Sequence, residues 1–414
     1  MAKPRQPNDS VRSLAEALAL LLPDVEVTIR SEWVPLARAR DRILSTPLLA
    51  PADLPPCDNA AMDGYAVRTA DLAAHAKSGF RIVGRAAAGH PFEGGPGEGE
   101  AVQIFTGAPM PAGTDMVIMQ EACLSDGQSL RLVGEAKPGA HCRRQGEDVR
   151  RGSTIFPAGR RLRAIDIALA AALGFHELTV FNRLRVALFS TGDELREPGA
   201  PLGPGQIWDA NRPLLRALLE ELGFETVDLG IIPDDPVALD RRLSDAAHSH
   251  DFIVTSGGMS VGSEDYMRRV IRERGALEMW RLAIKPGKPV GFGDIDTCPI
   301  LALPGNPVAA LVTFLMFGRP ILLRFAGAGA ETLPVLRVAA GFDYRKKAGR
   351  RDFLFGTVTP DGEGISRAVP TPKQGSAMLS PLVGMQGFIA LEEAREEVKP
   401  GEPVDFIPIG PVAS

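Results

Sequence analysis

The chain has 414 residues, of which 45% are hydrophobic and 23% are charged, and its formal net charge is −5 at pH 7. This length exceeds what one hydrophobic core usually supports, so we expect two to four globular domains. The acidic balance argues against a general nucleic-acid-binding protein, although it leaves room for a local cationic pocket. The four cysteines form no Cys-x-x-Cys pair, so neither a zinc site nor a disulfide framework is expected.

No targeting or membrane segment is expected near the start of the chain. Residues 1–10 lack the apolar core of a signal peptide, and the apolar run at 17–23 is too short to span a bilayer. We therefore expect a cytoplasmic protein without a membrane partner.

The first predicted element is a docking helix over residues 11–22. Val11, Leu14, Ala15 and Leu18 fall on one face at helical spacing.

The next part of the chain predicts a small β domain inserted into a second domain. Over residues 46–142 short β-like runs alternate with glycine and proline, and the stretch 89–100 has the composition of an exposed loop. The flanking segments, 1–45 and 143–180, are interpreted as a linker or dimerisation domain. A helix is expected over 160–175, with Gly174 as its stop signal.

Residues 181–326 predict an α/β domain, and residues 327–414 predict a second small β domain. Continuous apolar strands alternate with helices, a pattern typical of a parallel sheet that helices cover on both faces. Asn211 and Pro213 carry the signals that open one of these helices, and Gly223 closes it.

Three loops follow strands of this α/β domain, at the edge where such sheets bind ligands. Two of them carry acids, and two expose backbone N–H groups at helix starts, where the helix dipole favours an anion. Phosphate together with a divalent cation is the ligand that suits this chemistry. The loops are Thr191 to Glu194, Gly257 to Asp265, and Pro304 to Pro307.

Each of these features also has an ordinary structural explanation. A loop of this kind can be a turn that caps a helix, and its glycines can serve only a positive φ angle. Lys285 and Lys288 flank a proline-glycine turn, which is either a solvated hairpin or two amines directed at one anion. The acids at 58–65, the segment 106–109 and the charged run 143–148 are, taken singly, more readily structural than chemical.

The conjunction of these stretches resembles the molybdopterin molybdenumtransferase family, which includes the E-domain of gephyrin. The resemblance covers nearly the whole chain, in both order and spacing. The matching stretches are DNAAMDGYAVR (58–68), TGAPMPAGTDMVIMQE (106–121), RRQGEDVRRG (143–152), FSTGDEL (189–195), SGGMSVGSEDY (256–266), AIKPGKPVGFG (283–293) and LPGNPVAA (303–310).

The resemblance implies an enzyme that inserts molybdate into molybdopterin. Molybdopterin adenylate and Mg²⁺ are used, and AMP and molybdenum cofactor are released. The implied fold is an elongated four-domain chain with a central doubly wound α/β domain of the molybdopterin-binding type, an inserted β domain and a C-terminal β-barrel-like domain. The implied partners are a second copy that shares the active cleft, a molybdopterin adenylyltransferase and apo molybdoenzymes, with no nucleic acid.

The resemblance also implies roles for particular residues. Glu194 and Asp265 act as catalytic residues at the metal, and Lys285 and Lys288 hold the molybdate. Asp58 or Asp63, together with Thr106, reaches in from the partner subunit. The expected substrate-binding residues are Gly257, Gly258, Ser260, Asp228, Pro304, Gly305, Asn306, Pro307, Arg350 and Ser376. Asn306 either caps the helix that follows or reaches the ligand.

Two positions depart from the family pattern, and two other classes of function stay open. Phe355 stands where the family usually has arginine, and Ala377 where glycine is common. A non-catalytic scaffold on the same fold is one alternative, although it would not need the acids and lysines together. A nucleotide-binding enzyme of other specificity is the second, weakened by the lack of a GxxxxGK[ST] loop.

Overall fold

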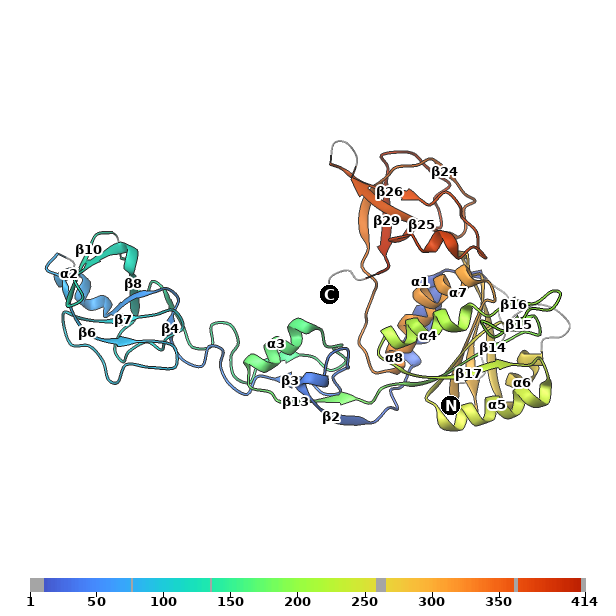
Figure 1. Cartoon of the computed structure of the whole chain (residues 1–414), viewed down its shortest axis with the longest axis horizontal. Coiled ribbons are helices and arrows are strands. Elements are labelled where there is room, and N and C mark those ends of the chain that lie inside the picture. Colours follow the sequence, from blue (N-terminus) through green and yellow to red (C-terminus); the bar gives the residue numbers. More distant parts are fainter. Residues whose placement is uncertain (1–10, 76, 135, 258–265, 361–363, 411–414) are drawn as a thin grey trace. The chain divides into compact units, whose positions relative to one another are not determined.

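The computed structural model describes residues 11–75, 77–134, 136–257, 266–360 and 364–410 (Figure 1). Contacts within the chain separate it into two compact units. The first unit comprises residues 1–45, 158–164 and 177–414, and the second comprises residues 46–157 and 165–176. The finer division into four domains stays a prediction.

The first unit is built on a seven-stranded sheet with the order β1-β19-β21-β22-β18-β14-β17. The strands β22, β18, β14 and β17 run parallel, whereas β21 runs antiparallel to both of its neighbours. The expectation of an all-parallel sheet is therefore wrong, because β21 pairs antiparallel with both β19 and β22. The strands are β1 (Val11–Arg12), β14 (Arg185–Thr191), β17 (Glu225–Ile232), β18 (Phe252–Ser256), β19 (Gly275–Leu282), β21 (Pro289–Ile295) and β22 (Cys298–Leu303).

The antiparallel pairing follows from the two-residue turn between β21 and β22. Asp296 and Thr297 form this turn with φ angles of 46° and 75°. A turn of two residues can join only antiparallel strands, since parallel strands need a long crossover. Arg274 donates to the Asp296 carboxylate over 3.2 Å and so supports the turn.

The strands of this sheet are buried on both faces, as their continuous apolar sequence predicts. Val186 and Leu188 of β14 pack in one core with α4 (Asn211–Glu221) and α7 (Pro307–Thr313), and Ala187 and Phe189 pack in another with α5 (Pro236–Ser249) and α6 (Tyr266–Arg274). Figure 1 shows the two groups of helices on opposite faces of the sheet. The doubly wound α/β architecture is therefore confirmed.

One helical run in this unit is apolar and long enough to cross a membrane by length and composition alone. It extends over Pro307–Phe325 and comprises α7, the π-helical η5 (Phe314–Gly318) and α8 (Arg319–Phe325). Because 83% of its apolar window is buried inside the structure, it is the core helix of the α/β domain.

The N-terminal helix is shorter than expected. Helix α1 covers Leu14–Leu21, where Ser13 caps it by a reciprocal capping box with Glu16. Val11 and Arg12 instead form β1, which pairs with Arg281 and Leu282 of β19. Helical spacing of Val11 was therefore misleading, because the cap at Ser13 excludes the residues before it from the helix.

The C-terminal part of the first unit is a closed five-stranded barrel. The sheet runs in the order β25-β26-β23-β29-β27, and β27 pairs back to β25. Residues such as Leu354 and Ile389 fill its interior, while Phe353 and Phe388 on the alternate positions join the core of the α/β domain. The strands are β23 (Leu336–Ala340), β25 (Arg351–Pro360), β26 (Ser366–Pro370), β27 (Gly387–Leu391) and β29 (Pro403–Pro408), and β20 (Ile284–Lys285) adds to β25 from outside the barrel.

The second unit contains a six-stranded sheet with the order β8-β5-β7-β6-β10-β9, as the texture of residues 46–142 predicts. Helix α3 (Ala164–Ala172) ends before Gly174, whose φ angle of +87° confirms it as the stop. The strands are β5 (Gly64–Val67), β6 (Phe80–Ala86), β7 (Glu100–Ile104), β8 (Met116–Met119), β9 (Cys123–Ser125) and β10 (Ser129–Leu132).

Short elements complete the described chain. The two-stranded pairs are β2 (Ser31–Pro35) with β13 (Glu177–Phe181), β3 (Leu48–Leu49) with β12 (Thr154–Phe156), β4 (Asn59–Ala60) with β11 (Cys142–Arg143), β15 (Leu195–Arg196) with β16 (Ile207–Trp208), and β24 (Tyr344–Arg345) with β28 (Glu397–Val398). The short helices are η1 (Leu22–Asp24), η2 (Leu36–Arg38), η3 (Thr69–Asp71), α2 (Leu72–His75), η4 (Gln120–Ala122) and η6 (Ser380–Leu382).

Candidate active site

A cavity of about 1030 Å³ lies in the first unit, where loops of the α/β domain face loops of the barrel. This volume is at the upper end of the range for small-molecule sites. Many of the residues expected from the sequence line it. They are Glu194, Gly257, Lys285, Lys288, Pro304, Gly305, Asn306, Arg350 and Ser376.

The turn that carries the two lysines is held rigidly against α7. Thr313 donates through its hydroxyl to the Gly287 carbonyl over 3.3 Å, and the Leu282 N–H donates to the Lys288 carbonyl over 2.8 Å. Gly287 has a φ angle of +109°, and a Cβ there would stand 2.3 Å from the Thr313 hydroxyl oxygen. The turn thus requires glycine and directs Lys285 and Lys288 to the cavity wall.

The loop from Pro304 to Pro307 is held from behind by two buried side chains. The Asn211 amide donates to the Gly305 carbonyl over 2.7 Å, and the Ser256 hydroxyl donates to the Pro304 carbonyl over 3.2 Å. Asn211 begins α4 as expected but does not cap it, since its side chain serves this loop. Asn306 is the N-cap residue of α7 and lines the cavity, but its side chain makes no capping hydrogen bond.

Two glycines on this wall are required for different reasons. Gly257 has a φ angle of +96°, and a Cβ there would lie 2.3 Å from the Thr191 carbonyl oxygen, so the backbone itself demands glycine. At Gly305 an added Cβ would meet only the Gly257 Cα atom, at 3.9 Å. The protein's own packing therefore does not demand a glycine at Gly305, and the missing side chain leaves free space on the cavity wall.

Glu194 is the expected acid that lines this cavity. It follows β14, is exposed, and its carbonyl accepts a 2.8 Å hydrogen bond from the Ile207 N–H across the β15–β16 pair. Asp265, Gly258 and Ser260 lie outside the described residues, as do the other positions from 258 to 265.

The described residues contain no group of three or more His, Cys, Asp or Glu side chains that could hold a metal ion. Mg²⁺ nevertheless keeps several waters and is commonly bound by one or two carboxylates together with substrate phosphates. A single exposed carboxylate on a cavity wall, such as Glu194, fits that mode of binding.

Asp228 does not line the cavity. Its two carboxylate oxygens accept hydrogen bonds from Arg212 over 2.6 and 2.5 Å, and Arg212 also contacts Asp209 and Glu197. Burial acts to raise the pKa of Asp228, but hydrogen bonds from Arg212 and Gly230 outweigh it and hold this pKa below its usual range. The geometry gives Asp228 a structural part, and Pro307, at the start of α7, is likewise outside the cavity lining.

The barrel contributes residues that sequence reasoning missed. Tyr344, Lys347, Asp352 and Gln374 line the cavity together with Arg350 and Ser376. The Ser376 carbonyl accepts a 3.1 Å hydrogen bond from the Val308 N–H and so links the barrel to the start of α7. The closely spaced charges from Arg345 to Asp352 are the sequence signal that could have indicated Lys347 and Asp352.

The departure at Phe355 has a structural consequence. Its side chain is 2% exposed and packs in the core shared with the α/β domain. Gln374 accepts from the Phe355 N–H over 3.1 Å and donates to its carbonyl over 2.8 Å. The position supplies packing rather than charge, so the cations on the barrel side of the cavity are Lys347 and Arg350.

The three remaining expected residues lie in the second unit. Asp63 accepts two 2.7 Å hydrogen bonds from the N–H and the hydroxyl of Thr106, and these hold the pKa of its carboxyl below the usual range. Asp58 accepts from the Gln145 N–H over 2.8 Å and from Arg144 over 2.6 Å, and these contacts lower its pKa as well. Both carboxylates are thus ionised and held in place before any ligand binds.

Comparisons with known families define the class of protein to which this fold and cavity belong. A model of the MoeA N-terminal region (domain I and II) matches residues 12–174, one of a probable molybdopterin binding domain matches residues 187–324, and one of the MoeA C-terminal region (domain IV) matches residues 337–409. The chain is therefore of the multidomain class built around a molybdopterin-binding α/β domain.

Curated relatives narrow this class to one family. The molybdopterin molybdenumtransferase of Haemophilus influenzae is 37% identical over 398 residues, which cover 96% of this chain and 98% of that protein. The enzyme of the same name from Nostoc is 36% identical and covers 86% of this chain and 83% of its own. The chain belongs to the molybdopterin molybdenumtransferase family.

Solved structures agree with this assignment. A molybdopterin biosynthesis MoeA protein from Pyrococcus horikoshii superposes with a TM-score of 0.81 at 28% identity, over 97% of this chain and 100% of that one. A second structure of this kind from Pyrococcus has a TM-score of 0.74 at 30% identity, over 96% of this chain and 99% of that one.

Proposed function

We propose that this chain inserts molybdate into molybdopterin, taking molybdopterin adenylate as substrate with Mg²⁺ and releasing AMP and molybdenum cofactor. The family is one of transferases. The proposal specifies three groups beyond that class: Mg²⁺ as the metal, AMP as the released nucleotide and molybdate as the oxyanion. The observation that supports it most directly is the cavity of about 1030 Å³, in which Lys285, Lys288, Lys347 and Arg350 face a glycine-lined wall.

The cations suit the oxyanion. Molybdate is a tetrahedral dianion, and ammonium and guanidinium groups offer several N–H donors to it. Because the turn of Lys285 and Lys288 is already fixed by Thr313 and Leu282, these donors need little reorganisation when the anion arrives.

The part of the cavity wall around Gly305, where a side chain is missing, suits the adenylated pterin. The space left at Gly305 lets a flat or phosphorylated group approach the backbone, and Asn306 offers an amide side chain beside it. We expect the pterin and its pyrophosphate to lie along Gly257, Pro304, Gly305 and Asn306. Ser376, Gly258 and Ser260 stay expected substrate-binding residues of the same proposal.

Mg²⁺ would be held by Glu194, with Asp265 as the second expected carboxylate. When bound, it neutralises the pyrophosphate and draws charge from the phosphoanhydride bond that breaks. Glu194 is exposed and lines the cavity, and the hydrogen bond from the Ile207 N–H fixes its backbone.

The quaternary and cellular context belongs to the same proposal. We expect a cytoplasmic homodimer in which Asp58, Asp63 and Thr106 of one subunit complete the cleft of the other. The donor of the substrate is then a molybdopterin adenylyltransferase, and the acceptors of the product are apo molybdoenzymes.

The activity is tested by incubating the full chain with molybdopterin adenylate, molybdate and Mg²⁺. We expect AMP release that depends on molybdate, followed by reconstitution of an apo molybdoenzyme. AMP release that is absent, or independent of molybdate, would leave a scaffold or a different nucleotide enzyme as the explanation.

Glu194→Ala tests the assignment of the metal site. We expect AMP release to fall by at least about 100-fold, since loss of even an outer partner of a metal costs up to that factor. The matched control is Glu225→Ala, which changes an exposed acid at the amino end of β17 that pairs with Arg185 on the surface. Near-normal turnover in Glu194→Ala would assign this carboxylate a structural role.

A further inference from the structure

Asp352 is a buried acid directly behind the cationic wall of the cavity. It is the second residue of β25, lines the cavity, and is 0% exposed. The parallel pairing of β20 with β25 places Lys285 opposite Asp352. A carboxylate in such a position must be compensated by nearby cations or donors, because desolvation of an unpaired charge is very costly.

Three side chains surround this carboxylate. The Tyr344 hydroxyl donates to Oδ2 over 3.2 Å, and the Lys285 ammonium lies 3.7 Å from the same oxygen. Arg350 Nε lies 3.3 Å from Oδ1. Burial, together with the charge of Asp352, raises the pKa of Tyr344 to about 12, so the phenol remains a donor.

Most N–H donors of Lys285 and Arg350 stay available to a ligand in the cavity. The side chains of Lys285 and Arg350 are 50% and 42% exposed, and both line the cavity. An ammonium has three N–H donors and a guanidinium has five, so a single contact with Asp352 leaves the others available. In the part of the chain that the structure describes, Arg350 Nε and Asp352 Oδ1 are buried without a hydrogen bond. Their contact is thus an ion pair, which orients the Arg350 guanidinium and leaves its other N–H donors available to the cavity.

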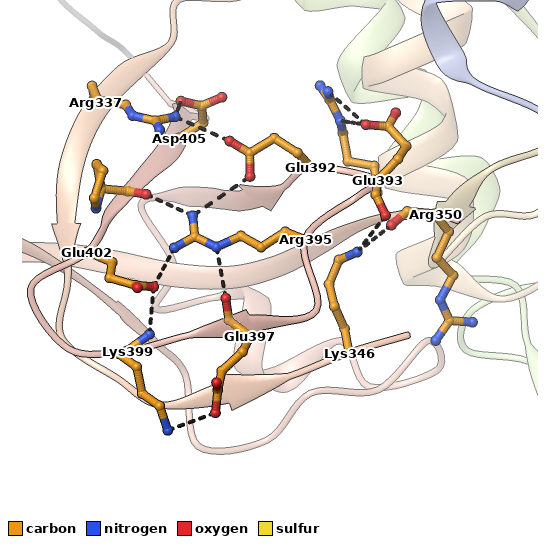
Figure 2. A network of polar contacts seen from close by, with 12 residues as sticks. Arg337, Lys346, Arg350, Glu392, Glu393, Arg395, Glu397, Lys399, Glu402 and Asp405 are labelled. Atoms are coloured by element: carbon orange, nitrogen blue, oxygen red, sulfur yellow. Dashed lines mark hydrogen bonds and ion pairs between the residues drawn. The ribbon is translucent and has the colours of Figure 1, made fainter. Parts of the chain in front are cut away.

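The backbone of Arg350 is fixed independently of its side chain. The Lys346 ammonium donates to the Arg350 carbonyl over 2.7 Å and to the Glu393 carbonyl over 3.4 Å, and the Gly349 N–H donates to Glu393 as well, over 2.9 Å. Figure 2 shows this anchoring, with the guanidinium of Arg350 extending away from the carboxylates of the surrounding ionic network. Among the described residues, Asp352 is the acid that forms an ion pair with this guanidinium.

We infer that Asp352 is a positioning residue, which holds Lys285 and Arg350 so that their remaining N–H donors converge on a tetrahedral dianion in the cavity. The inference rests on the proposed function, in which that dianion is molybdate. A carboxylate between two cations also reduces their mutual repulsion, which allows both to face the same anion.

The test is Asp352→Asn in the full chain, with Asp343→Asn as the matched control. Asp343 is an exposed acid of the same barrel and pairs with Lys399 over 2.8 Å on the surface. We expect the KM for molybdate in AMP release, and the Kd for molybdate in equilibrium dialysis, to rise about tenfold in Asp352→Asn, while kcat changes less than about twofold. The control should match the wild type in all three quantities.

The sign of the effect separates positioning from bulk electrostatics. Removing a negative charge beside two cations would by itself strengthen anion binding. An unchanged or lower KM and Kd in Asp352→Asn would therefore overturn the inference. Introducing Asp352→Asn into the Lys285→Ala/Arg350→Ala variant should add less than about a twofold effect, because the groups it positions are gone. A full tenfold effect in that background would also overturn it.

Two further measurements keep the outcome decisive. Thermal unfolding shows whether Asp352→Asn folds. If it does not, Tyr344→Phe replaces it, since this change removes one donor from the same carboxylate and should raise the molybdate Kd about threefold. An unchanged Kd in Tyr344→Phe would contradict the inference. If the wild-type chain releases no AMP, the proposed function fails and this inference fails with it. A functional wild type with an unaltered Asp352→Asn overturns the inference alone.

Discussion

Gly257 and Gly305 show that the same residue type serves opposite purposes at one site. Gly257 is demanded by its φ angle of +96° and by the nearby Thr191 carbonyl, whereas Gly305 leaves space that nothing in the described structure fills. The backbone requires the first glycine, whereas the protein's own packing does not require the second, and we propose that the space at Gly305 serves recognition. Sequence inspection treats the two alike, since it records only the absence of a side chain.

Paired alanine substitutions should separate these two roles. We expect Gly305→Ala to leave the free energy of unfolding unchanged or raise it by up to about 1 kcal/mol, since the backbone there accepts a Cβ. Its KM for molybdopterin adenylate should rise about tenfold, because an extra methyl group then occupies the binding wall.

Gly257→Ala should behave in the opposite way. A non-glycine residue at a positive φ, with a Cβ 2.3 Å from a carbonyl oxygen, should cost about 2 kcal/mol or more of folding stability. Urea unfolding and AMP-release kinetics measure both quantities on each variant. A Gly305→Ala variant with normal kinetics would show that the free space is not used by the substrate.

At the scale of elements, Arg212 joins three parts of the α/β domain. It projects from α4, and its guanidinium contacts Asp228 of β17, Asp209 after β16, and Glu197 after β15. The Arg212 side chain is 7% exposed and that of Asp209 is 2% exposed, so this pair is largely removed from water, whereas Asp228 is partly buried and Glu197 is exposed. These contacts connect the β15–β16 pair, which begins beside Glu194, to strand β17 of the sheet.

Replacing this arginine should destabilise the domain strongly. We expect Arg212→Met to lower the free energy of unfolding at pH 7 by about 3–5 kcal/mol, because buried carboxylates lose their partner. Arg216→Met is the matched control, one helical turn further on α4, where the pair with Glu220 is about half exposed and should cost less than about 1 kcal/mol.

The effect of Arg212 should also depend on pH. The folded-state pKa of Asp228 is lowered, so its contribution is fully present above its unfolded pKa of about 3.9 and is lost as the pH falls through the folded value. Urea unfolding of the wild type and Arg212→Met between pH 7 and pH 3 should therefore show a difference that narrows at the acid end. A difference independent of pH would assign the effect to packing.

At the scale of the whole molecule, the proposed site draws on both units through a second copy of the chain. The cavity and its cations belong to the first unit, whereas Asp63 and Thr106 belong to the second. A shared cleft in a symmetric dimer would place each set twice, once in each active site.

Subunit complementation tests this sharing. Asp63→Ala and Lys285→Ala homodimers should each be inactive. After exchange of subunits in an equal mixture, activity should return to about a quarter of the wild-type value, since half of the dimers carry one intact site. Light scattering confirms the dimer in each sample. A mixture as inactive as its components would place the required residues on the same subunit.

Local signals predicted much of the fold for a clear physical reason. The helix start at Asn211 and the stops at Gly174 and Gly223 each depend on a few neighbouring residues, whose φ angles are nearly independent of the rest of the chain. Two expectations from periodicity are wrong. The turn at Asp296 and Thr297 makes β21 antiparallel, and the cap at Ser13 makes α1 start at Leu14.

The sequence by itself determined the family, the loops at the carboxyl ends of the strands, and the residue types that line the cavity. Those features are encoded by short motifs, in which the chemistry and the spacing stand side by side. Tertiary structure alone decided that Asn211 supports the loop at Gly305, that Asp228 is bound by Arg212, and that Asp352 lies behind Lys285. These contacts join residues distant in the chain, and only the packing of the elements brings the charges close enough to act on one another.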